Sequence, residues 1–154
     1  MMKPGKKPWN NYMKKIELII FDWNGTLSQM QFAQEGGVVS ELYPEVPHIL
    51  HSLDQQGYLL AIATNMSRAG IERELAHHHL AAYFVYVATL DQAPAKPNPQ
   101  MLFDILDFTG VDAEHALMIG DTSADEAMAA AAGTDFLRVE NGVTSPLLEQ
   151  VISK

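Results

Sequence analysis

Polar residues with reactive side chains stand where apolar, β-rich runs of this sequence end. Asp22 follows the run IELIIF and precedes a turn that contains Gly25 and Thr26. A carboxylate in this position can attack phosphorus, while the backbone amides of the turn approach the phosphoryl oxygens. An Asp before a Gly turn more often has only a structural role in the turn. The residues at the other strand ends therefore have to decide whether Asp22 is part of a reactive site.

Two further segments carry groups that can hold a phosphate. Thr64 follows the run LLAIA and precedes a helical pattern, so its hydroxyl and the amide of Asn65 can bind a phosphate at a helix N-terminus. A plain helix cap is the alternative for Thr64. Lys96, in AKPNP, can place a positive charge on the phosphate and on the nucleophilic carboxylate. A solvated surface lysine is the alternative for Lys96.

The segment LMIGDTSADEAMAAAAG predicts a strand, a tight turn and an Ala-rich helix, with Asp121 and Asp125 four residues apart. Carboxylates clustered beside Asp22 would repel one another unless a hard cation lay between them, and Mg²⁺ is the natural candidate. A turn residue and a first-turn helix charge would explain each Asp separately. They would not explain why both lie in register with the other strand ends.

The elements that position these residues follow from the alternation of short β-rich runs with longer helical patterns. The alternation predicts an α/β fold with a parallel sheet, whose ligands bind beyond the carboxyl ends of the strands. The expected strands are Ile16–Phe21, Tyr58–Ala63, Tyr83–Val87, Ala116–Ile119 and Phe136–Val139. The expected helices are Glu45–Gln56, Arg68–His79, Pro99–Phe108, Ala124–Ala132 and Ser145–Ile152.

Length and composition limit the classes of protein. The 154 residues predict one domain over residues 15–154, preceded by a basic, flexible tail, residues 1–14. A net charge of −9 argues against nucleic acid and anionic membranes as partners, because the charges repel. The absence of cysteine excludes disulfides and thiolate chemistry. Since the sequence has no secretory signal and no bilayer-length apolar run, we expect a cytoplasmic protein.

Four segments, in this order, resemble the motifs of the haloacid dehalogenase (HAD) superfamily: FDWNGTL, IATNMS, AKPNP and IGDTSAD. The resemblance extends from Ile16 to Val139, and the runs KPNPQMLFDIL and AAAAG are most similar to the phosphoglycolate-phosphatase-like branch. It implies a Rossmann-like, three-layer α/β/α sandwich with a central parallel sheet of about five strands.

The resemblance also implies a role for each residue of the motifs. Asp22 would form an aspartyl-phosphate, while Thr64 and Lys96 would hold the phosphoryl group. Asp125 would support the metal site through its water shell or through Lys96. The implied Mg²⁺ site comprises Asp22, Asn24 through its backbone carbonyl, Asp121 and Asp125.

Asn24 departs from the family pattern D-x-D, in which a second acid protonates the leaving oxygen and then activates the attacking water. An amide can do neither. General acid–base catalysis contributes about 10²- to 10⁴-fold, so we expect slow turnover, with the second half-reaction affected most. In the family the metal contact at this position is a backbone carbonyl, which Asn24 also has, so metal binding should survive.

Length is the second departure from the family. Only seventeen residues, Leu27–Tyr43, lie between Thr26 and Pro44, where phosphoglycolate-type enzymes insert a helical cap. The thirty-one residues between Thr64 and Lys96 are already used by a helix, a strand and a loop. We therefore expect no cap domain. An open site would accept a bulky phosphorylated substrate, either a small molecule or a macromolecule. It would also accept a second copy of the chain that supplies the lid.

The sequence thus predicts a Mg²⁺-dependent HAD-family phosphatase, a hydrolase that acts through an aspartyl-phosphate with reduced turnover. A catalytically impaired relative that binds Mg²⁺ and a phosphorylated ligand or partner is the main alternative, because of Asn24. A dehalogenase is less favoured, since that chemistry needs no metal and normally uses a cap. A receiver domain also pairs Asp, Lys and Mg²⁺, but its phosphate acceptor follows the third strand, whereas Asp22 follows the first.

Overall fold

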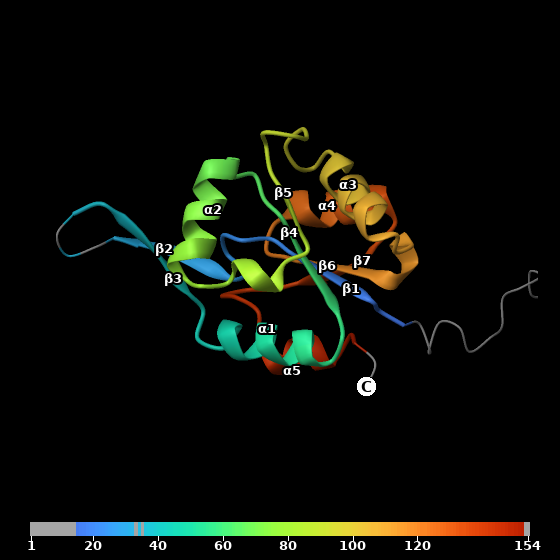
Figure 1. Cartoon of the computed structure of the whole chain (residues 1–154), viewed down its shortest axis with the longest axis horizontal. Helices are drawn as coiled ribbons and strands as arrows, with labels where there is room; N and C mark the ends of the chain where they lie inside the picture. Colours follow the sequence, from blue (N-terminus) through green and yellow to red (C-terminus); the bar gives the residue numbers. More distant parts are fainter. Residues whose placement is uncertain (1–14, 33, 35, 153–154) are drawn as a thin grey trace, which may run out of the picture.

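The computed structural model describes residues 15–32, 34 and 36–152, so the tail predicted over residues 1–14 lies outside the described residues. A five-stranded sheet forms the centre, in the order β5-β4-β1-β6-β7, with every neighbouring pair parallel (Figure 1). The strands are β1 (Leu18–Phe21), β4 (Leu59–Ala63), β5 (Tyr86–Ala88), β6 (Ala116–Gly120) and β7 (Asp135–Arg138). The predicted α/β class with a parallel sheet of five strands is confirmed.

The middle strand, β1, is fully buried. Side chains of a strand alternate between its two faces, so a strand covered on both faces has to be apolar throughout. Phe21 is in register with Ile62 of β4 and with Ile119 of β6, and the three strands therefore end at nearly the same level. Asp22 continues this edge, because its N–H donates to the carbonyl of Ile119 at 3.0 Å.

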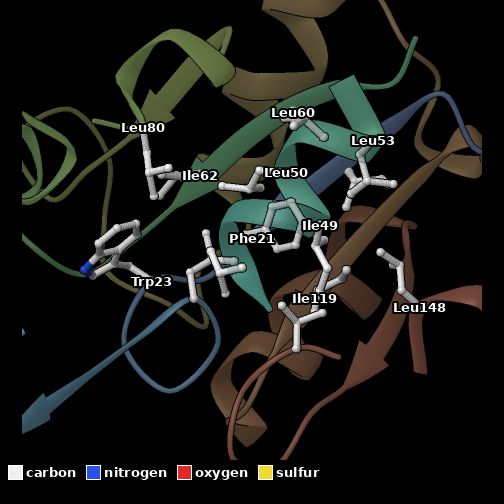
Figure 2. Packing of buried hydrophobic residues seen from close by; sticks show 14 of the residues in the cluster. Phe21, Trp23, Ile49, Leu50, Leu53, Leu60, Ile62, Leu80, Ile119 and Leu148 are labelled. Atoms are coloured by element: carbon white, nitrogen blue, oxygen red, sulfur yellow. The ribbon is translucent and has the colours of Figure 1, made fainter. Parts of the chain in front are cut away.

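Helices cover both faces of the sheet and give the three-layer sandwich that the sequence predicts (Figure 1). On one face Phe21 packs among side chains such as Ile49, Leu50 and Leu148 (Figure 2). On the other face Leu18 and Ile20 belong to a second buried cluster. The first face is covered by α1 (Val46–Gln55), α2 (Arg68–His77) and α5 (Ser145–Glu149), the second by α3 (Gln100–Thr109) and α4 (Ser123–Ala132).

The third expected strand is wrong at its start. Residues Ala81–Tyr83 form the short 3-10 helix η2, in which the Tyr83 N–H donates to the carbonyl of Leu80 at 3.1 Å. Strand β5 begins only at Tyr86. The run AAYFVYVA is apolar enough to suggest a longer strand, but its first residues turn instead of extending.

Two helices end earlier than expected. Helix α2 stops at His77 because His79 takes a left-handed conformation with φ of 58°, which cannot continue a right-handed helix. Helix α5 stops at Glu149, three residues before the expected end. A second 3-10 helix, η3 (Ala113–His115), precedes β6.

The short segment after Thr26 forms an antiparallel hairpin of β2 (Ser28–Phe32) and β3 (Val38–Leu42). The hairpin rises from the edge of the sheet at which β1 ends, and it stands away from the body of the domain (Figure 1). His78 of the α2 C-terminus meets Ser40 Oγ at 2.7 Å and ties the hairpin to α2. The hairpin occupies the segment at which phosphoglycolate-type enzymes insert a helical cap, in agreement with the expectation that this chain has none. No helix within the described residues has the length and apolarity needed to cross a membrane.

Candidate active site

Asp22 lies at the end of the central strand with its carboxylate held in one orientation. The side chain is buried, and its Oδ1 accepts hydrogen bonds from the Trp23 N–H and from Lys96 Nζ, both at 2.8 Å. A buried carboxylate needs such donors, because an ionised carboxylate without partners is costly to bury. The strand end and these two donors together fix the direction in which Asp22 faces the cleft.

The backbone amides of the turn after Asp22 make hydrogen bonds within the turn itself. The Gly25 N–H donates to the Ser28 carbonyl at 2.7 Å, and the Thr26 N–H points to the Trp23 carbonyl at 3.3 Å. The prediction that Gly25 and Thr26 bind phosphate through these amides therefore does not fit the geometry. Gly25 has another function, because its φ is 86° and a Cβ at this position would overlap the Asp121 carboxylate.

Lys96 is a buried cation between two carboxylates. Its side chain is 5% exposed, and Nζ lies 2.8 Å from Asp22 Oδ1 and 2.8 Å from Asp125 Oδ1. The alternative of a solvated surface lysine is therefore wrong. The loop between β5 and α3 carries Lys96 across the end of the sheet to a position between β1 and α4.

Asp125 is fixed by the start of α4. Its Oδ2 accepts from the Thr122 N–H at 3.2 Å and from Thr122 Oγ1 at 2.9 Å, while the Asp125 N–H donates to Thr122 Oγ1. This reciprocal capping box leaves Oδ1 directed at Lys96. Asp125 thus caps the N-terminus of α4 and pairs with the lysine at the same time.

Burial raises the pKa of the Asp22 carboxyl to about 7. The Lys96 ammonium lowers this pKa and opposes the effect of burial, whereas the negative charge of Asp125 raises it further. Two carboxylates share one ammonium, so the cluster without further cations carries excess negative charge.

Thr64 and Asn65 follow β4 at the same edge. Thr64 is buried, and its Oγ1 accepts from the Met66 N–H at 3.1 Å, so its hydroxyl proton can be donated elsewhere. The helix-cap alternative for Thr64 is wrong, because Ser67 caps α2 by accepting from the Gly70 N–H. Asn65 Oδ1 accepts the backbone N–H of Lys96 at 3.0 Å.

Three carboxylates converge where a cation could bind. Asp22, Asp121 and Asp125 each offer an oxygen, and the three oxygens lie within 4.8 Å of one another. Within the described residues, Asp121 Oδ1 is buried and has no hydrogen-bond partner. An orphaned, buried carboxylate oxygen in an acidic cluster fits a hard divalent cation such as Mg²⁺.

A cleft of about 360 Å³ opens at this edge of the sheet. Asn24 is exposed there, whereas Trp23 is fully buried and donates its indole N–H toward Glu74 Oε1 at 3.4 Å. The cleft thus lies at the strand ends that the sequence predicted to form a site. Its lining residues are Asp22, Asn24, Thr64, Asn65, Met66, Lys96, Thr122, Ala124 and Asp125.

Comparison with known proteins identifies the family of the chain. Residues 30–139 match the sequence profile of the haloacid dehalogenase-like hydrolases. The chain belongs to this family. A phosphoglycolate phosphatase of Aliivibrio fischeri is 38% identical over 127 residues, which are 80% of this chain and 56% of that protein. A phosphoglycolate phosphatase of Vibrio parahaemolyticus is 38% identical over 103 residues, 66% of this chain and 45% of that protein. The chain spans about half the length of the curated relatives it matches.

Solved structures share the fold at lower identity. A HAD-superfamily hydrolase from Ehrlichia chaffeensis superposes with a TM-score of 0.74 at 16% identity, over 86% of this chain and 93% of that one. CbbY from Rhodobacter sphaeroides, in complex with phosphate, superposes with a TM-score of 0.69 at 17% identity, over 81% and 86% of the two chains. The HAD resemblance and the Rossmann-like fold predicted from the sequence are confirmed.

Sequence reasoning missed three contacts of this HAD site. The Asn65 side chain bonds the Lys96 amide, Trp23 reaches Glu74, and Thr122 holds Asp125. Only the last had a signal in the sequence, since a Thr three residues before an Asp at a helix start predicts a capping box. The other two join segments that are distant in the sequence.

Proposed function

We propose that the protein is a Mg²⁺-dependent phosphomonoesterase that acts through an aspartyl-phosphate on Asp22. The observation that carries this proposal is the buried Lys96 ammonium, 2.8 Å from both Asp22 and Asp125 beside an open cleft. A cation held in this way stabilises the ionised nucleophile and offers positive charge to an incoming phosphoryl group. The similarity to phosphoglycolate phosphatases supports a phosphate ester as substrate.

The reaction has two steps. In the first, Asp22 attacks phosphorus, a carboxylate–phosphorus bond forms, and the ester oxygen leaves with its electron pair and takes a proton from water. In the second, water attacks the phospho-enzyme, loses a proton to solvent, and releases inorganic phosphate from Asp22. Because Asn24 can neither donate nor accept that proton, both transfers depend on solvent and the second step is slow.

The donors at the strand ends orient the phosphoryl group. The Thr64 hydroxyl and the Asn65 backbone amide donate to its oxygens, and Lys96 supplies the charge. The Gly25 and Thr26 amides are not among these donors, since both make hydrogen bonds within the turn.

The metal ligands in this proposal are Asp22, Asp121 and the backbone carbonyl of Asn24. The orphaned Asp121 oxygen supports this assignment, and Gly25 leaves room for that carboxylate. When bound, Mg²⁺ neutralises the negative charge on the phosphoryl oxygens. We assign Asp125 the role of pairing with Lys96 and not that of a metal ligand, because one of its oxygens faces the ammonium and the other accepts from Thr122.

The open cleft favours a large substrate. No lid is present in the described part of the chain to supply binding energy around a small ester, so remote contacts of a larger phosphorylated metabolite or macromolecule have to do so. A second copy of the chain could supply the same contacts. Phosphoglycolate should therefore be a poor substrate of the monomer, and efficient hydrolysis of it by a proven monomer would contradict this part of the proposal.

A phosphate-binding protein without turnover is the second candidate, and the Asn24 amide favours it. Intact mass spectrometry after incubation with p-nitrophenyl phosphate and Mg²⁺ separates the two. We expect a phosphorylated species that Asp22→Asn abolishes and that the exposed control Asp107→Asn retains, together with slow phosphate release. Absence of both phospho-enzyme and phosphate release, with inorganic phosphate still bound, would leave the second candidate.

A further inference from the structure

The side chain of Asn65 makes a contact that phosphate binding does not require. Its Oδ1 accepts the backbone N–H of Lys96 at 3.0 Å, across thirty-one positions of the sequence. A backbone N–H is a donor only, so the oxygen of the Asn65 amide has to face Lys96. This bond joins the segment after β4 directly to the residue whose ammonium pairs with the nucleophile.

The rest of the loop is anchored at its beginning. Arg68 binds this part twice, since its backbone N–H donates to Asp91 Oδ1 at 2.7 Å and its guanidinium donates to Gln92 Oε1 at 2.8 Å. The Leu90 N–H also donates to the Met66 carbonyl at 3.2 Å. These contacts lie four or more residues before Lys96. The Asn65 contact is made at Lys96 itself.

The ammonium of Lys96 has to satisfy two fixed partners. Asp22 is fixed by the end of β1 and Asp125 by its capping box, and both of their Oδ1 atoms lie 2.8 Å from Nζ. A lysine side chain has four flexible torsions, so fixing its Cα limits the conformers and favours those in which the ammonium reaches both carboxylates. Small displacements of a catalytic group, of about 1 Å, can lower a rate by about 10²-fold.

We propose that Asn65 is a positioning residue for Lys96, which it holds through the Lys96 backbone amide so that the ammonium meets Asp22 and Asp125 together. The effect on catalysis rests on the proposed phosphatase function, whereas the effect on Lys96 does not. The role belongs to the Asn65 side chain and is separate from any donation by the Asn65 backbone N–H to phosphate.

The first test measures Lys96 without using catalysis. Acetic anhydride labelling of the full chain, read by peptide mass spectrometry, should modify the buried Lys96 slowly and the exposed Lys15 rapidly. Asn65→Ala should raise the rate at Lys96 several-fold and leave Lys15 unchanged. Asn65→Asp keeps an acceptor for the amide and should restore protection.

The matched control is Asn98→Ala in the same loop. Asn98 is exposed, and its Oδ1 accepts the Gln100 N–H at 2.9 Å, so this substitution removes a similar bond that does not touch Lys96. It should leave the labelling of Lys96 unchanged. Equal protection of Lys96 in wild type and Asn65→Ala, with both proteins folded by circular dichroism, would overturn the proposal.

The second test is a double-mutant cycle on kcat with p-nitrophenyl phosphate and Mg²⁺. Asn65→Ala should lower kcat by about 10-fold when Lys96 is present, within the range expected for a displaced catalytic group, and add little in a Lys96→Ala background. Additive losses would mean that the Asn65 side chain acts on substrate directly, and would overturn the proposal. If wild type shows no turnover but Lys96 labelling rises in Asn65→Ala, the proposed function fails while the positioning role stands.

Discussion

The two sides of the cleft differ in how firmly they are built. On one side Lys96 is buried between Asp22 and Asp125. Asp22 accepts from the Trp23 N–H, Asp125 accepts from the Thr122 N–H at its helix cap, and the Lys96 N–H donates to the Asn65 side chain. On the other side Asn24 is exposed, and the hairpin beyond it ends in an almost fully exposed Phe32. In the proposed reaction the first side supplies the nucleophile and the positive charge, and the second side faces the leaving group.

This difference separates two tasks that one site usually combines. Holding a phosphoryl group needs buried, paired charges, which are present. Proton transfer and exclusion of water need an acid or base and a cover, and Asn24 and the hairpin supply neither. Under the proposed function, the site therefore supports formation of a phospho-enzyme better than its hydrolysis. Changes on the two sides should have effects of different kinds.

The largest change should come from Asn24→Asp, which restores the missing acid and base. We expect phosphate release to rise by about 10²- to 10⁴-fold, with the phospho-enzyme no longer accumulating. Steady-state release and a quenched-flow burst measure the two effects. If Asn24→Asp is as slow as wild type, the open side of the cleft is not what limits turnover.

Lys96→Met should affect stability as well as activity. At pH 8 it leaves two buried carboxylates without their cation, and breaking such a pair costs about 3–5 kcal/mol. The matched control is Arg138→Met, whose exposed pair with Glu126 at 3.4 Å is worth no more than about 1 kcal/mol. Urea unfolding of both variants without Mg²⁺ gives the comparison. Equal losses would show that Lys96 is not the main support of the buried side.

Mg²⁺ should stabilise the protein more at pH 8 than at pH 5. The folded-state pKa of Asp22, about 7, lies above its ordinary value, so the folded protein binds the extra proton and the metal-free form loses stability as pH rises between about 4 and 7. At pH 8 the ionised carboxylate is free for the metal, whereas at pH 5 a proton competes.

Thermal shifts at millimolar Mg²⁺ measure this effect, since a few carboxylates and waters bind with a Kd of about 10⁻⁴ to 10⁻³ M. Asp121→Ala should remove the shift at both pH values. A larger shift at pH 5, or an unchanged one in Asp121→Ala, would count against a metal held by these carboxylates.

The sequence predicted the buried side of this contrast better than the open one. Continuous apolar runs located β1 and the other strands, and the residues after them formed a recognisable set. The hairpin escaped prediction because SQMQF and VVSEL mix polar and apolar residues, and their pairing depends on the turn after Asn24. The burial of Lys96 could not be derived from AKPNP, since it results from two carboxylates that lie far away in the sequence.

The hydrogen-bond partners of the backbone amides after Asp22 could not be predicted from the sequence either. The Gly25 and Thr26 amides looked available for phosphate because the sequence does not reveal which carbonyls a turn will use. In the structure the Trp23 carbonyl faces three successive N–H groups, those of Thr26, Leu27 and Ser28. Such local closure depends on φ and ψ angles, which residue types restrict only in part.

The smallest expected effect concerns the chemical stability of Asn24 on the open side. Asn-Gly is the dipeptide in which the glycine nitrogen most readily attacks the side-chain amide, and the succinimide formed opens to Asp or isoaspartate. Conversion would restore D-W-D-G-T and mimic Asn24→Asp. The structure opposes it, because the Gly25 N–H donates to the Ser28 carbonyl at 2.7 Å and the Ser28 N–H donates to the Trp23 carbonyl at 3.1 Å, so the residues on both sides of Asn24 are bonded to Ser28. We therefore expect folded protein stored at mildly alkaline pH to keep Asn24 and to show constant activity. Peptide mass spectrometry across residues 16–31, alongside a phosphatase time course, measures both.

Protein stored in urea is the control that should convert, and Asn141–Gly142 is a second Asn-Gly pair within the same chain. Activity that grows on storage together with conversion at Asn24 would show that the turn opens often enough for the glycine nitrogen to react.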